Sequence, residues 1–398
     1  MPIDLARARS QTPGCGHVLH LDNAGAGLMP EPVIEAVRRH LTLEAEIGGY
    51  AAERREAGRI AAVYDSIARL LNAEPGEIAL IENATRAWDM AFYALSFEPG
   101  DRILTAMAEY ASNYIAFLQV ARRTGAVVEP VPNDETGALS LAALEAMIDD
   151  RVKLIAITHV PTNGGLINPA AGIGRIARAA RIPFLLDACQ SVGQMPIDVA
   201  AIGCDMLSAT GRKFLRGPRG TGFLYVRRGM IGRLEPPFLD LHAASWVARD
   251  RYQIRADARR FETWESYVAG RLGLGAAVDY ALEWGLEAIR ARAFGLAEGL
   301  REGLAAIPGV TVADLGREKC AIVTFAVEGR PADAVARALA AQAINVSTST
   351  VRSTRLEMAA RGIDALVRAS PHYYTSEEEI ERFTAAVGEI AQGRRVAR

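Results

Sequence analysis

The sequence predicts an α/β protein with a mainly parallel sheet between helices, followed by a smaller α+β unit. Over the first part of the chain, short apolar runs alternate with amphipathic stretches, which is the pattern of strands and crossover helices. After about Arg251 a long helical pattern takes over. We expect residues 20–250 to form a large domain, and residues 1–19 and 251–398 to form a small one.

Each expected element follows from its local pattern. Apolar runs predict strands at 77–81, 102–106, 126–131, 153–158, 183–186 and 205–209, and amphipathic stretches predict helices at 86–96, 113–124, 140–149 and 170–181. The second unit should hold a helix over 267–305, a strand at 321–327, a helix at 331–342 and a Ser/Thr-rich loop at 347–354. A strand near Leu366 and a closing helix from Ser376 complete it.

Composition excludes several classes of protein. Of the 398 residues half are hydrophobic and 23% are charged, and the net charge of -2 comes with no basic tract, so we expect neither nucleic-acid nor membrane-surface binding. The longest uncharged run contains several proline and glycine residues, which argues against a transmembrane helix. No apolar leader begins the chain, and four scattered cysteines suit a reducing compartment without a metal site, so a cytoplasmic location is expected.

Lys213 is the first candidate for chemistry. The chain has 45 basic residues but only three lysines, so arginine serves wherever charge alone is needed. Lys213 follows the expected strand 205–209 in a glycine-rich stretch. Unlike guanidinium, an amine can lose its proton and form a Schiff base with a carbonyl. The alternative is a solvated surface amine.

Two polar clusters follow other expected strands. Asp187 comes directly after an apolar run, where a buried carboxylate needs a cation such as a protonated pyridine nitrogen; alternatively it caps a turn. The segment 81–88 passes from strand to helix through small polar residues, which suits either an anion such as phosphate or simple capping by Asn83 or Thr85. No P-loop motif is present, and the glycine pairs lie in the wrong context for a dinucleotide.

These clusters, in this order, resemble the class V aminotransferase family. Thr85-Arg is followed by Asp187-Ala-Cys-Gln190, then by Thr210-Gly-Arg-Lys213 and the run Gly217-Pro-Arg-Gly-Thr-Gly-Phe-Leu-Tyr-Val226. The resemblance runs from about Asp22 to Glu381. It implies the pyridoxal 5'-phosphate (PLP)-dependent fold type I, with a seven-stranded sheet in the large domain.

The resemblance also implies roles for individual residues. Lys213 would hold PLP as a Schiff base, Asp187 would face the pyridine nitrogen and Gln190 would bind the phenolic oxygen. The other residues expected to bind the cofactor are Ala84, Thr85, Thr210 and Arg212 at the phosphate, Tyr110 stacked on the ring, and Thr162 near the ring oxygen, with Asn163 one position later.

Further residues of the family pattern concern the substrate and a second subunit. Arg368 would grip the substrate carboxylate, although it could instead pair with Glu377 or Glu378. Asn23 would lie over the substrate or serve as a turn residue. The resemblance implies a homodimer in which the loop around Trp264 and Glu265 reaches the partner's active site, with Glu265 directed to Arg212 or to the substrate.

The reaction is predicted in part from the absence of a cysteine in one loop. Cysteine desulfurases of this family use a loop cysteine to accept sulfur, but residues 344–355 contain none, so sulfur transfer to the enzyme is disfavoured. The C-terminal motifs resemble a subgroup that includes isopenicillin N epimerase-like proteins and the carbon-sulfur lyase of ergothioneine biosynthesis. We therefore expect a β-eliminating lyase that cleaves a cysteine S-conjugate or sulfoxide. Aminotransferase and epimerase activities are alternatives, and a non-catalytic PLP-binding sensor is a further one.

Overall fold

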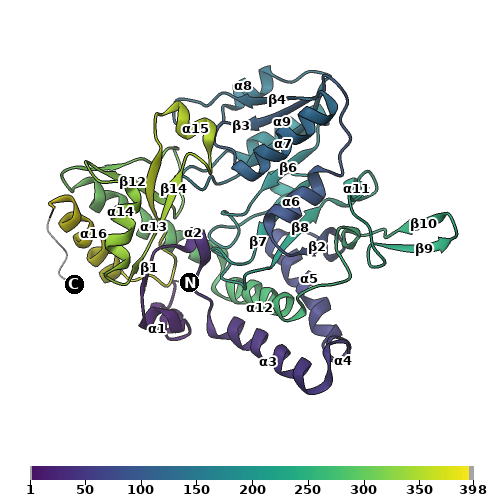
Figure 1. Ribbon diagram of the computed structural model, residues 1–398, viewed down its shortest axis with the longest axis horizontal. Coiled ribbons are helices and arrows are strands. Elements are labelled where there is room, and N and C mark those ends of the chain that lie inside the picture. Colours follow the sequence, from purple (N-terminus) through teal and green to yellow (C-terminus); the bar gives the residue numbers. More distant parts are fainter. Residues whose placement is uncertain (1, 394–398) are drawn as a thin grey trace.

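The computed structural model describes residues 2–393, and a seven-stranded sheet forms its larger part (Figure 1). The strand order is β2-β8-β7-β6-β5-β3-β4, and β8 alone runs in the direction opposite to the other six strands. The expected mainly parallel sheet is thus confirmed. The bounds are β2 (Ile78–Ile81), β3 (Arg102–Ala106), β4 (Val127–Val131), β5 (Val152–Thr158), β6 (Phe184–Asp187), β7 (Met206–Thr210) and β8 (Gly222–Val226).

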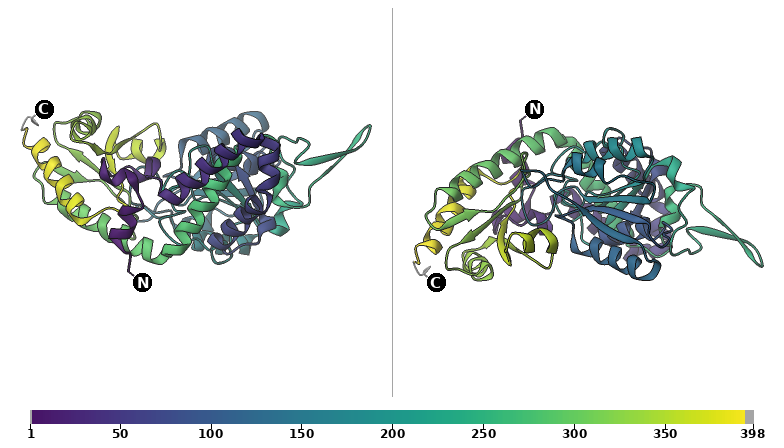
Figure 2. Two further views of the ribbon diagram at one scale, coloured as in Figure 1. Left: turned by 90° about the horizontal axis from the view of Figure 1, so that it is seen from below. Right: turned by 90° about the horizontal axis from the view of Figure 1, so that it is seen from above.

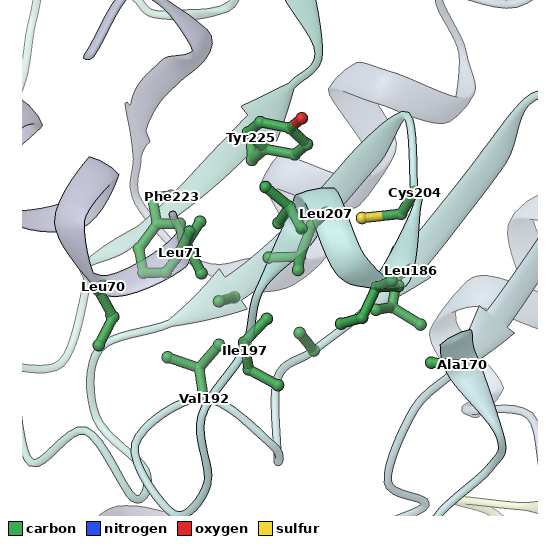
Figure 3. Close-up of a cluster of buried hydrophobic side chains, with 14 of the residues drawn as sticks. Leu70, Leu71, Ala170, Leu186, Val192, Ile197, Cys204, Leu207, Phe223 and Tyr225 are labelled. Carbon is green, nitrogen blue, oxygen red and sulfur yellow. The ribbon is translucent and has the colours of Figure 1, made fainter. Parts of the chain in front are cut away.

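Helices cover both faces of this sheet because successive strand residues point to opposite sides. Leu185 packs in one apolar cluster and Leu186 in the other. Figure 3 shows Leu70 and Leu71 of α5 near Phe223 in the second of these clusters. One face carries α5 (Ala57–Leu71), α8 (Leu141–Ala146), α9 (Ala170–Ala180) and α12 (Val268–Trp284); the other carries α6 (Ala84–Phe92), α7 (Ala111–Thr124) and α11 (Arg228–Ile231). Helix α10 (Val199–Ile202) contacts α9.

The smaller part is built on an antiparallel sheet of order β11-β12-β15-β14. Leu300, Phe325 and Phe383 lie in its core. The strands are β11 (Val310–Val312), β12 (Val323–Val327), β14 (Ser347–Thr350) and β15 (Ala365–Ala369), and the helices are α13 (Leu286–Ala305), α14 (Ala332–Ala340), α15 (Arg355–Ala360) and α16 (Glu377–Ala391). Helix α16 begins as expected because the Ser376 and Glu379 side chains each accept a hydrogen bond from the other's backbone.

The N-terminal segment contacts both parts of the molecule. Strand β1 (Leu19–His20) pairs in parallel with β13 (Ile344–Asn345) of the smaller part, whereas α3 packs against α12 beside the large sheet. The helices of this segment are α1 (Leu5–Ser10), α2 (Asn23–Ala26), α3 (Glu31–Ile47) and α4 (Gly49–Arg55); short 3-10 turns lie at η1 (Pro13–Gly16), η2 (Pro75–Glu77) and η3 (Ala258–Phe261). The domain boundaries drawn from the sequence stay a prediction.

Three local expectations differ from the structure. The long helix over 267–305 is two helices, because Gly285 adopts a φ of 82° and ends α12. Residues 347–350 are strand β14 instead of loop, since they pair with β15. The sequence also gave no signal for the hairpin of β9 (Ala244–Ala248) and β10 (Arg251–Ile254), which projects from the body in Figure 2. Its strands pair with each other and not with either large sheet.

Helix length and polarity bear on membrane insertion. Across residues 2–393 the longest helix, α13, has 20 residues. No helix of this part of the chain has both the length and the apolar character needed to span a bilayer.

Two helical glycines allow a test of this packing. A Cβ at Gly174 in α9 would lie 1.8 Å from the Ile202 carbonyl oxygen, whereas a Cβ at Gly295 in α13 would meet no atom within 4 Å. We expect Gly174→Ala to lower the free energy of unfolding by about 1–3 kcal/mol, because α9 and α10 must separate. Gly295→Ala should raise it by about 0.5–1 kcal/mol. Urea denaturation of both variants measures this, and equal midpoints would contradict the close approach.

Candidate active site

The candidate active site lies at the carboxyl edge of the large sheet, where ligands of open α/β sheets bind. A pocket with about 560 Å³ of empty space opens there. Its lining includes every residue that the sequence predicts to bind the cofactor. The lining residues are Asn83, Ala84, Thr85, Tyr110, Asn113, Thr158, Val160, Thr162, Asp187, Cys189, Gln190, Thr210, Arg212 and Lys213.

Lys213 reaches the pocket from the loop between β7 and β8. Backbone hydrogen bonds close this loop: Gly211 N–H donates to the Thr221 carbonyl (2.9 Å), and Gly217 N–H donates to the Gly211 carbonyl (2.7 Å). Burial lowers the pKa of Lys213, and the neighbouring cations Arg212 and Arg368 lower it further. A larger fraction of the amine is therefore neutral than in water, which favours attack on a carbonyl.

Asp187 ends β6 and is 6% exposed. Its carboxylate accepts hydrogen bonds from the Asn113 amide (2.9 Å) and from Cys189 N–H (2.9 Å). Burial raises its pKa, and these two hydrogen bonds oppose that effect. The bond from Cys189 N–H is the turn-capping role considered as an alternative, so Asp187 both caps the turn and faces the pocket.

The first turn of α6 also borders the pocket. Asn83 caps the helix by accepting a hydrogen bond from Arg86 N–H (2.9 Å), while Ala84 and Thr85 line the pocket. Thr210 at the end of β7 and Arg212 lie on the same lining, and the Arg212 guanidinium is held by the Gly25 carbonyl. A helix N-terminus beside a guanidinium is suited to an anionic group such as phosphate.

Gln190 and Thr162 form the polar wall next to Arg368. The Gln190 amide nitrogen donates to the Ala24 carbonyl (3.1 Å) and to Thr162 Oγ1 (3.3 Å). Its Oε1 is buried without a hydrogen-bond partner within the described part of the chain. Asn163, the neighbouring candidate, instead contacts Glu357. The structure thus places Thr162, and not Asn163, at the pocket.

Arg368 lies in β15 with its guanidinium buried beside Thr162. Nη1 donates to Thr162 Oγ1 (2.5 Å) and Nη2 donates to Asp22 (3.1 Å), whereas Nε has no partner among the described residues. The alternative pairing with Glu377 does not occur, because Arg292 binds that carboxylate (3.0 Å). Arg368 therefore keeps a free donor at the junction of the two parts of the molecule.

The structure does not bring every predicted residue to the pocket. The Asn23 amide is already bonded at both ends, donating to the Ser370 carbonyl (2.7 Å) and accepting from the Tyr374 hydroxyl (2.5 Å). Its predicted contact with the substrate stays a prediction. Trp264 and Glu265 line other surface hollows, and no ion pair joins Glu265 to Arg212 within residues 2–393.

Sequence reasoning missed the support beneath Asp187. Asn113 in α7 binds both Asp187 and Glu109, and Thr158 at the end of β5 also binds Glu109. The sequence does contain a signal for Glu109. It comes three residues after the expected strand 102–106, and Asp187 comes one residue after 183–186, so both acidic residues follow strands that end at the carboxyl edge of the sheet.

The residues that line the pocket fit PLP, the cofactor that the sequence implies. Asp187 matches a cationic ring nitrogen, Lys213 matches an aldehyde, and the first turn of α6 with Arg212 matches a phosphate. The buried Gln190 Oε1 that lacks a partner shows that this wall is built for a polar ligand.

Named curated relatives align with nearly the whole chain. A probable cysteine desulfurase of Xylella fastidiosa (strain 9a5c) is 34% identical over 382 residues, which are 93% of this chain and 90% of the relative. A probable cysteine desulfurase of Methanothermobacter thermautotrophicus is 29% identical over 94% of each chain.

Solved structures have the same fold. The apo cysteine desulfurase of Thermococcus onnurineus NA1 superposes with a TM-score of 0.90 at 28% identity and covers 99% of both chains. A C-DES mutant with glycine covalently linked to its PLP cofactor gives a TM-score of 0.86 at 25% identity, over 96% of this chain and 99% of that one. The predicted fold type is therefore confirmed.

These relatives overturn the predicted reaction. The expectation of a β-eliminating lyase for cysteine S-conjugates or sulfoxides is wrong, because the curated relatives and the Thermococcus structure are named cysteine desulfurases. The aminotransferase alternative is also weakened. The prediction rested on the missing cysteine in residues 344–355 and on C-terminal motifs that resemble another subgroup of the family.

The family itself is established by a match along most of the chain. The profile of the family described as Aminotransferase class-V matches residues 19–383. This range contains Lys213, Asp187 and Arg368 together with the whole large sheet. The chain belongs to the class V aminotransferase family, as its sequence motifs predicted.

Proposed function

We propose that the protein is a PLP-dependent enzyme that removes the sulfur atom from L-cysteine. The cofactor is PLP, and the reaction is of the cysteine desulfurase type. The observation that carries the proposal is the pocket that Lys213 and Asp187 line, together with the guanidinium of Arg368, which lies close enough to Lys213 to lower its pKa and keeps a free donor. The similarity to named cysteine desulfurases over 93% of the chain supports this choice of substrate.

The roles of the pocket residues follow from their charges. When bound, PLP withdraws electrons from the α-carbon of an amino acid attached to it. Asp187 would hold a proton on the ring nitrogen, because a buried carboxylate stabilises a positive charge beside it. Lys213, with its lowered pKa, takes the α proton as a general base and later returns it.

Arg368 would hold the substrate carboxylate. Two of its nitrogens already bind Thr162 and Asp22, which fixes the plane of the guanidinium. Its Nε remains as a buried donor, and such a group costs free energy unless an acceptor reaches it. A carboxylate satisfies that donor and offsets the positive charge.

The sulfur acceptor must come from elsewhere than residues 344–355, which contain no cysteine. We propose that a thiol from solution serves. Its thiolate attacks the substrate sulfur, the Cβ–Sγ bond breaks, and the electron pair of that bond stays with the carbon skeleton, which gains a proton to give alanine. The thiol becomes a persulfide, so the atoms and electrons balance without an added oxidant or reductant.

The test is product analysis with L-cysteine. We expect alanine and sulfide in equal amounts, because the second thiol of dithiothreitol displaces sulfide from the persulfide of the first. The rate should rise with the concentration of added dithiothreitol and then saturate. Formation of pyruvate and ammonia in place of alanine would contradict the proposal. Lys213→Ala should abolish turnover and the covalent attachment of PLP, detected by mass spectrometry after borohydride reduction. Lys153→Ala, at an exposed position, is the matched control and should keep both.

A second prediction concerns substrate binding. Arg368→Gln should raise the KM for L-cysteine by about 10- to 100-fold, because a charge-assisted contact is worth about 1.5–3 kcal/mol. Arg337→Gln on the surface of α14 is the control, since Arg337 pairs with Asp333 in the same helix. Steady-state kinetics of both variants measure the effect. An unchanged KM in Arg368→Gln would assign the carboxylate to another residue.

We also propose that the enzyme is a homodimer. Large apolar side chains are exposed on the β9–β10 hairpin and on segments near it, where a monomer would leave them in water. Trp246 is 82% exposed, and the others are Tyr50, Phe238, Leu241, Val247, Tyr252, Trp264 and Tyr267. Trp264 and Glu265 belong to this surface, so a partner subunit seated here would carry its own copy of that loop toward the interface.

The dimer is tested by its mass in solution. Trp246→Glu should weaken association by at least about tenfold, because it places a charge at the centre of an apolar contact. Leu118→Glu in α7 is the matched control, since Leu118 is also exposed but lies away from this surface. Analytical ultracentrifugation over a range of concentrations measures both. A wild-type protein that stays monomeric at every concentration would contradict the proposal.

A further inference from the structure

A second carboxylate, Glu109, lies beneath the active site and has no role in the mechanism above. It follows β3 at the carboxyl edge of the sheet and is 3% exposed. Within the described residues no arginine, lysine or histidine forms an ion pair with it. A buried carboxylate without a cation is costly, so its surroundings should explain its presence.

Its hydrogen-bond partners are backbone N–H groups, an amide and two hydroxyls. The Thr105 hydroxyl (2.9 Å), Tyr110 N–H (3.0 Å), the Asn113 amide (2.9 Å) and the Thr158 N–H (3.0 Å) and hydroxyl (2.5 Å) all lie within hydrogen-bond distance of it. The two N–H groups and the Asn113 NH₂ can only donate, whereas the two hydroxyls can donate or accept. Three fixed donors on one carboxyl group favour the ionised form.

Burial and these donors act in opposite directions on the protonation of Glu109. Burial raises its pKa to about 7, the hydrogen bonds from Thr158, Asn113 and Thr105 lower it, and the nearby charge of Asp187 raises it. A cation beside Asp187 would lower it again, because opposite charges favour the ionised form. Glu109 is thus poised to become fully charged when the site holds a cationic ring.

Asn113 joins the two carboxylates. Its amide nitrogen lies 2.9 Å from Glu109 Oε1 and 2.9 Å from Asp187 Oδ2, and an NH₂ group has one hydrogen for each. Glu109 therefore holds the Asn113 amide in the orientation in which it binds Asp187. The remaining bond to Asp187, from Cys189 N–H, reaches its other oxygen.

We propose that Glu109 is a positioning residue for the cofactor: through Asn113 it orients Asp187, and its negative charge favours the protonated ring nitrogen. This inference rests on the proposed function only in requiring PLP in the pocket. It needs no particular substrate or leaving group. Glu109 itself does not line the pocket, so it acts through Asn113 and through its charge.

The test is a pH titration of the visible absorption band of bound PLP, with no substrate present. Glu109→Gln keeps the size of the side chain and removes its charge. The protonated form of bound PLP then loses a stabilising negative charge, so the pH at which the cofactor is half protonated should fall by about one unit. The dissociation constant of PLP should rise several-fold. Glu109→Asp, which keeps the charge, should titrate close to wild type.

The matched control is Glu357→Gln. Glu357 is also buried and contacts an asparagine, Asn163, but it pairs with Arg361 away from the pocket. This variant should lose stability and leave the titration unchanged. If Glu109→Gln gives the same result as Glu357→Gln, Glu109 is a structural residue and the inference is wrong.

A second variant covers the case in which Glu109→Gln does not fold. Thr105→Val keeps Glu109 but removes one donor, so Glu109 should ionise less readily and the titration midpoint should fall by a smaller amount. No shift in Thr105→Val would then overturn the inference. Because the titration uses no cysteine, its outcome is independent of whether alanine is the product of turnover.

Discussion

The architecture of the site depends on how one carboxylate, Asp187, is kept charged inside the protein. The register of the sheet places Asp187 at the end of β6 opposite Thr158 of β5 and Ser208 of β7, in the middle of the parallel strands. Solvent cannot stabilise it there, and hydrogen bonds from α7 and from the following turn take the place of water. These hydrogen bonds do not neutralise the charge of Asp187, so the pocket favours a ligand with a positive charge beside it.

Charges of both signs surround that pocket. Asp187, Arg212 and Arg368 all lie close enough to Lys213 to shift its pKa, and the charge of Asp187 raises the pKa of Glu109. A molecule with a cationic ring and two anionic groups, a phosphate and a substrate carboxylate, complements these charges. If Arg368 of the small sheet binds that carboxylate as we propose, the two parts of the molecule must remain in contact for the site to be complete.

Much of this could be read from the sequence, and the failures have physical causes. Lys213 and Asp187 were predictable because polar residues that follow apolar strands meet at one edge of a parallel sheet, whereas Gln190 was predicted from the family resemblance. Gly285 was missed because a helical pattern continues across it and one positive φ leaves no mark on periodicity. Asn113 was missed as a ligand of Asp187 because its partner is 74 residues away. The reaction was mispredicted because an absent side chain in one loop was weighed above the rest of the chain.

The reversed direction of β8 has a consequence for the lysine. Because β8 lies antiparallel to β7 and pairs with it from Met206 to Thr210, both ends of the segment that carries Lys213 are held in the sheet. Gly211, Thr221 and Gly217 tie the segment to itself, so its backbone has little freedom to travel. The amine can pivot only about its own side-chain bonds, and each reactant must come to it. Opening and closing of the site is thereby left to the chain that surrounds the pocket, above all to the smaller part that carries Arg368.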